Sequence, residues 1–435
     1  MNNMKVSYYS LGCKVNLYES EAIINEFIDN GFILGKFNEK CDVYIINTCS
    51  VTEVSDSKSR KIIRQAIKQN DNAVIVVMGC YAQLKPDDIN KIEGVDVLIG
   101  TSNRDKVYQL VMECLNNKTS ITCVDEILNI KEYEELKITR YNDKTRGFIK
   151  IQDGCDNYCS YCTIPYARGH VRSRKKEDVI NEIQALTDSG IKEIVLTGIN
   201  TGQYGKDLSN YDFSDLLEDI CLKVNNLGRL RISSIEMTEI TQKLLNVIKK
   251  YQQYFCNHLH IPLQGGCDNT LKRMHRKYNI DEYLKKINLI RSYFNDINIT
   301  TDVMTGFSGE TIEDFNNSYS FIKLINYGEM HVFPYSRRPR TVAYNYDNIV
   351  SPQEKKRRVN LLLELNKQQA ILYRKSFLNK QLVLLVETEK NGYLYGHTSN
   401  YIEVMVKNSN NIKVNEYCNI KITSVDYPIC KGEVI

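Results

Sequence analysis

Several features are missing from this sequence of 435 residues, and each absence narrows what the protein can be. There is no tryptophan, which we interpret, with the abundance of Asn, Lys, Ile and Tyr, as the codon usage of an AT-rich genome. No uninterrupted apolar run reaches the roughly 18–20 residues of a membrane-spanning helix. The N-terminal residues lack the apolar segment of a secretory signal. We therefore expect a cytoplasmic protein with no membrane partner.

An excess of charge of either sign is also lacking. The chain has 57 basic and 53 acidic residues, which gives a formal net charge of +4. Such a balance creates no strong overall field, so any surface that binds nucleic acid must be local. Hydrophobic residues make up 42% of the chain, enough for a packed core, and the length suits two or three domains.

Cysteine, by contrast, is abundant, with 14 residues. Structural disulfides are rare in the reducing cytosol. Many cysteines in that compartment suggest metal binding or catalysis.

Residues 1–125 alternate apolar runs typical of strands with amphipathic runs typical of helices. We expect strands at 5–11, 42–47, 73–78 and 95–99, and helices at 19–29, 57–69 and from 86. This alternation predicts an N-terminal α/β domain built on a parallel sheet covered by helices. Residues 126–145 are charged and weakly patterned, and we expect a linker there.

Residues 146–375 contain about six further β/α units, which favour a (β/α)6 partial barrel over an open sheet because short strands recur evenly between helices. Residues 376–435 contain only strand-like runs separated by Asn, Gly and Ser turns. They predict a small all-β barrel of the OB kind. The predicted fold class is therefore α/β with a C-terminal β-barrel.

Three cysteines in the middle of the chain, Cys155, Cys159 and Cys162, have the spacing C-x3-C-x2-C and follow the first barrel strand. Three thiolates so close together can wrap one iron–sulfur cube, which usually takes four thiolates. With no fourth cysteine nearby, one iron stays open for a ligand. The alternative is a zinc site, but zinc requires four ligands, and His170 is the only nearby candidate for the fourth.

A second set, Cys13, Cys49 and Cys80, lies just past the ends of three predicted N-terminal strands. In a parallel sheet these loops emerge at the same edge, so the three thiols can converge. From spacing alone, buried packing thiols are an equally good interpretation. We interpret the remaining eight as packing thiols: Cys41, Cys114, Cys123, Cys221, Cys256, Cys267, Cys418 and Cys430.

The central motif resembles that of the radical S-adenosylmethionine superfamily. The whole chain resembles one family of this superfamily, the methylthiotransferases. Around the N-terminal cysteines the resemblance lies in Leu-Gly-Cys-Lys-Val-Asn, Asn-Thr-Cys-Ser-Val-Thr and Gly-Cys-Tyr-Ala-Gln. Further along the chain it covers residues 164–174, 198–207, 260–264 and 333–337. Residues 392–401 resemble the family's TRAM domain. Two positions depart from the pattern: Gly265 stands where the family usually has Ser, and Arg340 where it usually has Gly.

The resemblance implies two 4Fe–4S clusters, with Cys155, Cys159 and Cys162 as catalytic ligands of one and Cys13, Cys49 and Cys80 as ligands of the other. In the family, the open iron of the first cluster binds S-adenosylmethionine and the cluster cleaves it to a 5′-deoxyadenosyl radical. The second cluster carries the sulfur to be transferred. Residues matching the family's cofactor contacts are Tyr161, Gly198, Asn200, Gly306 and Gly309.

Within the family, the chain looks most like the type that methylthiolates C2 of N6-threonylcarbamoyladenosine beside the tRNA anticodon (position 37). The resemblance further implies a reduced flavodoxin or ferredoxin as electron donor. Alternatives inside the family are N6-isopentenyladenosine and a ribosomal-protein aspartate as substrates. A non-enzymatic alternative is a cysteine-rich RNA-binding protein whose fold is stabilised by structural zinc.

For the tRNA we expect three basic loop clusters to bind phosphates: 168–176, 272–277 and 337–340. Tyr393, Tyr395 and Tyr401 of the C-terminal barrel are candidates for base stacking. His258 and His260 are expected to face opposite ways on their strand and to be structural, not a pair of metal ligands.

Overall fold

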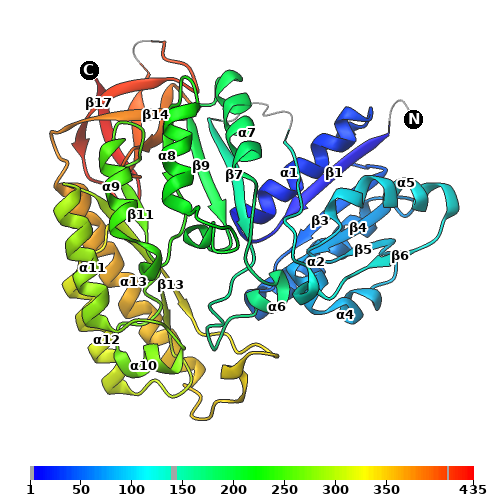
Figure 1. Ribbon diagram of the computed structural model, residues 1–435, viewed down its shortest axis with the longest axis horizontal. Helices are drawn as coiled ribbons and strands as arrows, with labels where there is room; N and C mark the ends of the chain where they lie inside the picture. Colours follow the sequence, from blue (N-terminus) through cyan, green and yellow to red (C-terminus); the bar gives the residue numbers. More distant parts are fainter. Residues whose placement is uncertain (1–3, 139–144, 409–410) are drawn as a thin grey trace. The chain divides into compact units, whose positions relative to one another are not determined.

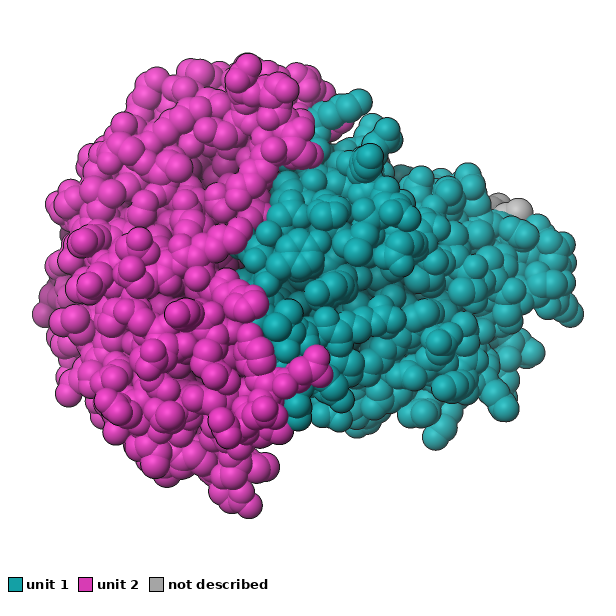
Figure 2. Space-filling view, turned by 60° about the horizontal axis from the view of Figure 1, so that its bottom comes forward, with its two compact units in different colours: residues 1–141, 150–175, 336–344 teal, residues 142–149, 176–335, 345–435 magenta. Residues whose placement is uncertain are grey.

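The computed structural model describes residues 4–138, 145–408 and 411–435 (Figure 1). The chain divides into two units, coloured separately in Figure 2. Unit 1 comprises residues 1–141, 150–175 and 336–344, and unit 2 comprises 142–149, 176–335 and 345–435. Part of the predicted linker, residues 139–144, lies outside the described residues. The predicted domain boundaries at 125, 145 and 375 stay predictions.

The N-terminal part of unit 1 is a six-stranded sheet of order β2-β1-β3-β4-β5-β6 in which every neighbouring pair is parallel. Its strands are β1 (Lys5–Ser10), β2 (Ile33–Leu34), β3 (Val43–Thr48), β4 (Val74–Gly79), β5 (Val97–Ile99) and β6 (Ile121–Cys123). The helices are α1 (Lys14–Asp29), α2 (Glu53–Gln69), α3 (Cys80–Leu84), α4 (Pro86–Asn90) and α5 (Val107–Asn117). The predicted parallel-sheet domain is confirmed.

Two apolar cores cover the faces of this sheet. One joins Val43 and Ile45 to residues of α1 and α5, and the other joins Tyr44 and Ile46 to residues of α2. Consecutive strand residues point to opposite faces, so a strand buried on both sides reads as a continuous apolar run. The Val-Tyr-Ile-Ile run of β3 is therefore the sequence of a central strand.

The central part of the chain has seven strands in two sheets: six barrel strands and the two-residue β8, which pairs antiparallel with β7. One has the order β10-β9-β7-β8 and the other β11-β12-β13, and isolated parallel bridges connect β10 with the β11 segment. The bounds are β7 (Arg146–Asp153), β8 (Arg172–Ser173), β9 (Glu193–Gly198), β10 (Arg229–Ile232), β11 (His258–His260), β12 (Asn298–Thr305) and β13 (Glu329–Pro334). The predicted partial barrel is confirmed.

Helices alternate with these strands, as a parallel barrel requires. They are α6 (Ile164–Arg168), α7 (Lys176–Asp188), α8 (Phe213–Lys223), α9 (Gln242–Lys250), α10 (Asp268–Arg273), α11 (Ile280–Tyr293) and α12 (Ile312–Ile325), and they are followed by the long α13 (Pro352–Lys375). Several begin with side-chain caps: Asp212, Asn279 and Thr311 each form a capping box. Such caps fix where a helix starts because they satisfy its free N–H groups.

The C-terminal strands close into a barrel of order β14-β15-β16-β18-β17 around an apolar core. Their bounds are β14 (Gln381–Lys390), β15 (Tyr393–Thr398), β16 (Glu403–Lys407), β17 (Tyr417–Ser424) and β18 (Cys430–Val434). The predicted small all-β barrel is confirmed.

The turn after β15 attaches this small barrel to the strands of unit 2. The ring of Tyr401 stacks between His258 and His397, with centroid distances of 4.9 and 4.7 Å, and the Arg231 guanidinium lies 4.6 Å from its centroid. Asn298 Nδ2 at the start of β12 donates to Asn400 O at 2.8 Å. Tyr401 therefore has a structural role, and the expectation that it stacks on RNA bases was wrong.

No helix among the described residues has both the length and the apolar character needed to cross a membrane.

Candidate functional site

The N-terminal cysteines lie at the carboxyl ends of three adjacent parallel strands. Cys13 follows β1, Cys49 directly follows β3, and Cys80 directly follows β4. The pairing places Ser10 beside Asn47 and Thr48 beside Gly79, so the three strands end at the same level. The structure thus brings together thiols that are 36 and 31 positions apart in the chain.

Small and amide-bearing neighbours hold these loops close to one another. A Cβ on Gly12, whose φ is +100°, would lie 2.9 Å from Cys49 Cβ. Asn16 Nδ2 donates to Leu11 O at 2.7 Å and to Thr48 O at 3.1 Å, which ties the Cys13 loop to the Cys49 loop. A larger residue at position 12 would push the two loops apart.

Neighbouring thiols disfavour the ionisation of Cys13 and of Cys49. Burial raises the pKa of Cys49 to about 11, and the neighbouring Cys80 and Cys13 add to that rise. Thiolates are the form that binds metal. Three thiols in one place therefore become a thiolate set only when a cation offsets their negative charge, as an iron–sulfur cluster does. This donor set fits such a cluster.

The central cysteines lie in a loop that leaves β7 through Gly154. This glycine has φ +76°, and a Cβ on it would lie 1.8 Å from His170 O, so only glycine fits. The loop then doubles back: Cys155 N donates to Gly169 O at 3.1 Å and Cys162 N to Cys159 O at 2.9 Å. Ile164 N–H donates to Cys162 Sγ at 3.4 Å. An N–H donor is a favourable partner for a thiolate that ligates a cluster.

The zinc alternative relied on His170. Its Nδ1 lies 2.7 Å from Asp156 Oδ1, and both side chains are largely exposed. The carboxylate orients the ring at the surface. Carboxylates also orient metal-ligating histidines in this way, so the pair by itself is equally compatible with a surface histidine and with a ligand.

The short helix α6 connects the two cysteine sets within unit 1. Ala167 of α6 packs on Cys80 and Leu84 of α3 in a small apolar core. The side chain of the next residue, Arg168, reaches Cys80, and its Nε lies 3.4 Å from Cys80 Sγ. Sequence analysis missed both α3 and α6, because a helix of five residues is too short to show a periodic pattern.

The arginines of segment 168–176 are not a surface for RNA. Arg168, Arg172 and Arg174 are 0, 3 and 1% exposed, and all three are paired with carboxylates. Consecutive arginines in a sequence indicate a basic surface only where the fold leaves them exposed. The prediction was wrong for these three, and only Lys175 and Lys176 of the cluster reach the surface.

Arg168 belongs to a buried ionic network inside unit 1. Glu19 accepts hydrogen bonds from Arg104, Arg168 and Lys150, and Asp153 accepts from Lys150 at 2.6 Å. Burial by itself would raise the pKa of Glu19 and of Asp153, but the surrounding cations hold both well below their usual range. Both carboxylates are therefore charged at neutral pH.

The predicted cofactor-contact residues of unit 2 lie at the carboxyl ends of barrel strands. Gly198 ends β9 and Asn200 follows it, while Gly306 and Gly309 follow β12 with φ of +72° and +80°. Gly306 N donates to Glu310 Oε2 at 2.6 Å. Ligands of barrel enzymes bind at this end of the strands. Tyr161, the remaining predicted contact, is half-buried in the central cysteine loop of unit 1.

Two residues that support this turn were missed by the sequence analysis. The Glu310 carboxylate is buried and also accepts from Arg358 Nη1 at 2.7 Å. It therefore connects the glycine turn to helix α13. No motif signals such a pair, because its members are 48 positions apart.

A group of histidines and one carboxylate lines strands β11 to β13. Asp302 lies 3.3 Å from His260 Nε2 and 3.2 Å from His331 Nδ1. His258 Nε2 and His260 Nδ1 both lie 2.9 Å from Thr300 Oγ1. Residues two apart on a strand share a face. The expectation that His258 and His260 face opposite ways was therefore wrong.

The other basic clusters are partly structural as well. Arg276 is paired with Glu236 and Arg338 with Asp56, each with a side chain that is largely buried. Lys272, Arg337 and Arg340 remain exposed. Arg340 also has a φ of +69°, a left-handed conformation that is unusual for a residue other than glycine.

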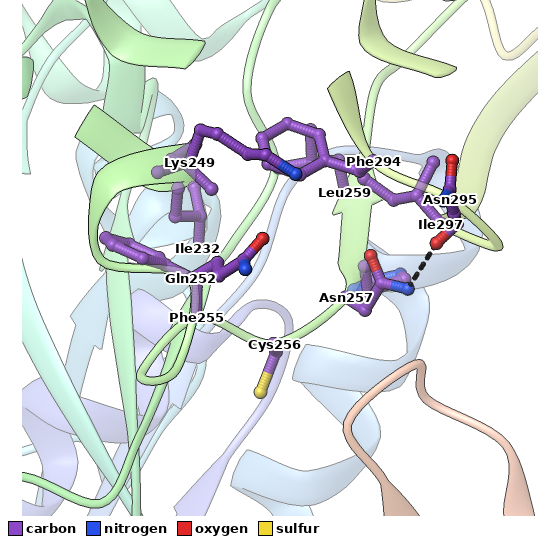
Figure 3. Close-up of a pocket in the computed structure, with 12 residues that line it drawn as sticks. Ile232, Lys249, Gln252, Phe255, Cys256, Asn257, Leu259, Phe294, Asn295 and Ile297 are labelled. Carbon is purple, nitrogen blue, oxygen red and sulfur yellow. Dashed lines mark hydrogen bonds between the residues drawn. The ribbon is translucent and has the colours of Figure 1, made fainter. Parts of the chain in front are cut away.

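None of the predicted ligands is among the residues that line a cavity of about 360 Å³ in unit 2 (Figure 3). Its lining includes Lys249, Phe294 and Cys256. Burial raises the pKa of Cys256 to about 12, so this thiol is not a reactive nucleophile. The eight cysteines outside the two sets all have a pKa raised by burial, which agrees with their interpretation as packing thiols.

Comparison with known families gives two matches on this chain. The Radical SAM superfamily matches residues 149–322, and the uncharacterized protein family UPF0004 matches residues 5–100. The first covers the central cysteines and the second covers the N-terminal ones.

Three curated relatives span nearly the whole chain. The threonylcarbamoyladenosine tRNA methylthiotransferase MtaB of Bacillus subtilis is 41% identical over 99% of this chain and 96% of its own length. The MtaB of Aquifex aeolicus is 36% identical over 92% of this chain and 96% of its own. The tRNA-2-methylthio-N(6)-dimethylallyladenosine synthase of Dictyoglomus thermophilum is 33% identical over 98% of both chains.

Among solved structures, the radical S-adenosylmethionine methyltransferase TsrM of Kitasatospora setae is similar in fold, with a TM-score of 0.58 at 14% identity over 79% of this chain and 77% of that one. A likeness at this identity concerns the fold alone. Together with full-length relatives above 30% identity, it identifies the chain as a member of the radical S-adenosylmethionine methylthiotransferase family.

Proposed function

We propose that this enzyme adds a methylthio group to C2 of N6-threonylcarbamoyladenosine at position 37 of tRNA, beside the anticodon. The observation that carries the proposal is the 41% identity, over 99% of the chain, to a relative named for that substrate. Relatives named for the dimethylallyl substrate reach 33%. Methylthiolation of the N6-isopentenyl (dimethylallyl) nucleoside is therefore the second candidate.

Cys155, Cys159 and Cys162 would hold the 4Fe–4S cluster that binds S-adenosylmethionine. When bound, this cluster supplies the electron that cleaves the S–C bond of the cofactor. The protein's own part is to hold three thiolates and leave one iron open. Gly154 starts the turn, the Gly169 carbonyl fixes the backbone of Cys155, and the N–H of Ile164 stabilises the sulfur of Cys162.

Cys13, Cys49 and Cys80 would hold a second 4Fe–4S cluster, on which the sulfur is delivered. The convergence of three strand ends supports this assignment, as does the effect of Cys80 and Cys13 on the pKa of Cys49. The absence of a fourth cysteine ligand leaves one iron for the sulfur. Both sites belong to unit 1.

Tyr161, Gly198, Asn200, Gly306 and Gly309 are the proposed contacts of S-adenosylmethionine. The amide of Gly309 donates to Asn348 O at 2.8 Å and that of Gly306 to Glu310. Their amides are therefore engaged within the protein. A Cβ on Gly306 would lie 2.4 Å from Lys355 Cγ and one on Gly309 2.3 Å from Arg273 Nη2, so the side chains of Lys355 and Arg273 already require glycine at these two positions.

For the tRNA, the cations of the three predicted clusters that the structure leaves exposed are Lys175, Lys272, Lys277, Arg337 and Arg340, and exposed Tyr393 stays a candidate for base stacking. Lys85, Arg338 and Arg340 line one cavity of about 320 Å³ in unit 1. Arg338 in this lining is buried and paired with Asp56, so we propose that only the exposed cations contact backbone phosphates of the anticodon loop. The electron donor is proposed to be a reduced flavodoxin or ferredoxin, and the site of action the cytoplasm, where tRNA is found.

Nucleoside mass spectrometry of tRNA from a deletion strain tests the substrate. The methylthio form of threonylcarbamoyladenosine should disappear and return when the gene is restored. Loss of the methylthio isopentenyl nucleoside instead would establish the second candidate. Unchanged tRNA would refute both.

The reconstituted enzyme tests the two clusters. It should contain about eight irons per chain, four for each 4Fe–4S cluster. Cys155→Ala should abolish the formation of 5′-deoxyadenosine. Cys80→Ala should retain the cleavage of S-adenosylmethionine but form no methylthio product. A zinc-only, colourless protein would refute the enzyme assignment altogether.

A further inference from the structure

The guanidinium of Arg168 is the cation that touches the N-terminal cysteine set. It is fully buried, and its Nε donates toward Cys80 Sγ at 3.4 Å. Its Nη2 donates to Asn16 Oδ1 at 2.6 Å, and that oxygen lies 3.8 Å from Cys13 Sγ. One side chain therefore contacts one cysteine directly and a second through an amide.

Two carboxylates fix the other edges of the same guanidinium. Arg168 Nη1 lies 2.5 Å from Glu19 Oε1 and 3.3 Å from Asp153 Oδ2, and Nη2 lies 3.1 Å from Glu19 Oε2. All three nitrogens have acceptors, so the planar group has a single orientation. This orientation points Nε at the sulfur.

Asp153 extends the connection to the central cysteine loop. Its Oδ1 accepts from Gly154 N at 2.9 Å, and Gly154 immediately precedes Cys155. Arg168 itself ends the helix that follows Cys162. The residue that touches Cys80 is thus held by the loop that carries the other three cysteines.

The other buried cations of the network differ from Arg168 in one respect. Arg104 bonds to Glu19, Glu134 and Asp153, and Lys150 bonds to Glu19 and Asp153. Within the described residues, the side-chain hydrogen bonds of Arg104 and Lys150 all go to carboxylates, while Arg172, which pairs with Asp153, donates to His170 O at 3.3 Å. Arg168 is distinguished by its contact with sulfur.

We propose that Arg168 raises the reduction potential of the cluster held by Cys13, Cys49 and Cys80. Because Arg168 is held by the loop that carries Cys155, Cys159 and Cys162, it couples that potential to the position of this loop. The inference rests on the proposed second cluster. Reduction adds negative charge to a cluster, and hydrogen bonds to its sulfurs and nearby positive charge favour the reduced state. Because Arg168 and Cys80 are both buried, solvent screens this effect on the reduction potential weakly. Arg168 is a positioning and tuning residue that touches no substrate in this scheme.

The experiment isolates the N-terminal cluster in a C155A/C159A/C162A background. Iron is counted first, and about four atoms per chain are expected. The cluster is then titrated with reductant and followed by electron paramagnetic resonance. In this background R168M/E19Q removes the donor together with one of its counter-charges, which keeps the buried network balanced. R104M/E134Q is the matched control, because it removes another ion pair of the same network, one that does not touch sulfur.

At a fixed ambient potential, R168M/E19Q should lower the ratio of reduced to oxidised cluster at least tenfold, which equals about 59 mV for one electron. R104M/E134Q should change that ratio less than threefold. Arg168→Lys keeps the charge but lacks the planar donor, and it should give an intermediate shift and an altered spectrum. If R168M/E19Q fails to fold or to bind four irons, the ratio of reduced to oxidised cluster in Arg168→Lys is compared with that of the background protein instead.

Equal ratios in the wild-type background and in both Arg168 variants would overturn the inference, as would equal shifts in R168M/E19Q and R104M/E134Q. A background protein with no bound iron would instead refute the second cluster itself. The iron count therefore separates failure of this inference from failure of the proposed function.

Discussion

The buried carboxylate of Asp56 gives a sharp stability prediction. It is 1% exposed and accepts hydrogen bonds from Ser50 Oγ at 2.7 Å, Arg338 Nη2 at 2.8 Å and Lys85 Nζ at 3.3 Å. Ser50 follows Cys49 in the chain. The Asp56–Arg338 pair therefore holds the segment 336–344 next to the loop of Cys49, inside unit 1.

Asp56→Asn keeps the size of the side chain and removes its charge. Arg338 would then be a buried cation without a counter-charge. Removing one partner of a buried pair typically costs 3–5 kcal/mol. Because the amide oxygen can still accept one hydrogen bond, we expect the lower end, about 3 kcal/mol. For a folding unit of this size that corresponds to a fall in Tm of about 6–12 °C.

Differential scanning calorimetry of the cluster-free protein measures this fall. Asp71→Asn is the matched control, because it makes the same change of charge at an exposed turn of the same domain and should shift Tm by less than about 1 °C. The double variant D56N/R338M should recover part of the loss, since it removes both partners. A Tm for Asp56→Asn equal to that of the control would refute the reasoning.

Three further predictions concern local structure and pH. Thr52→Ala removes the acceptor of the Ser55 N–H at the start of α2 and should cost about 1 kcal/mol in urea unfolding. Gly154→Ala would place a Cβ against His170 O and should halve the iron content, whereas Gly190→Ala, with positive φ but nothing within 4 Å, should not change it. The pKa values of Glu19 and Asp153 are lowered by folding, so the stability that they add is present above about pH 4 and is lost as pH falls through their folded-state values. Acid unfolding followed by circular dichroism should therefore be less steep in Glu19→Gln.

Much of the architecture could be predicted from the sequence because it is encoded locally. The apolar run of β3 and the amphipathic pattern of α2 each span enough residues to identify the element, and the observed bounds differ by a few positions. Helix α1 begins at Lys14, five residues before its predicted start, which makes Cys13 its N-cap. Polar residues in its first turn masked the helical pattern there.

The sequence by itself determined the alternation of strands and helices and the cysteine spacing, because periodicity and short motifs are properties of neighbouring residues, but it missed β2, β6 and α5 as well as the short helices α3 and α6. Only the tertiary structure decided which arginines are exposed and which are buried beside carboxylates. Arg168 reads as one member of a basic cluster, yet it pairs with Glu19, 149 positions away. Whether a charge faces solvent or a buried carboxylate depends on which strands lie side by side. That arrangement places Cys80 and Arg168 in contact, and no local pattern records it.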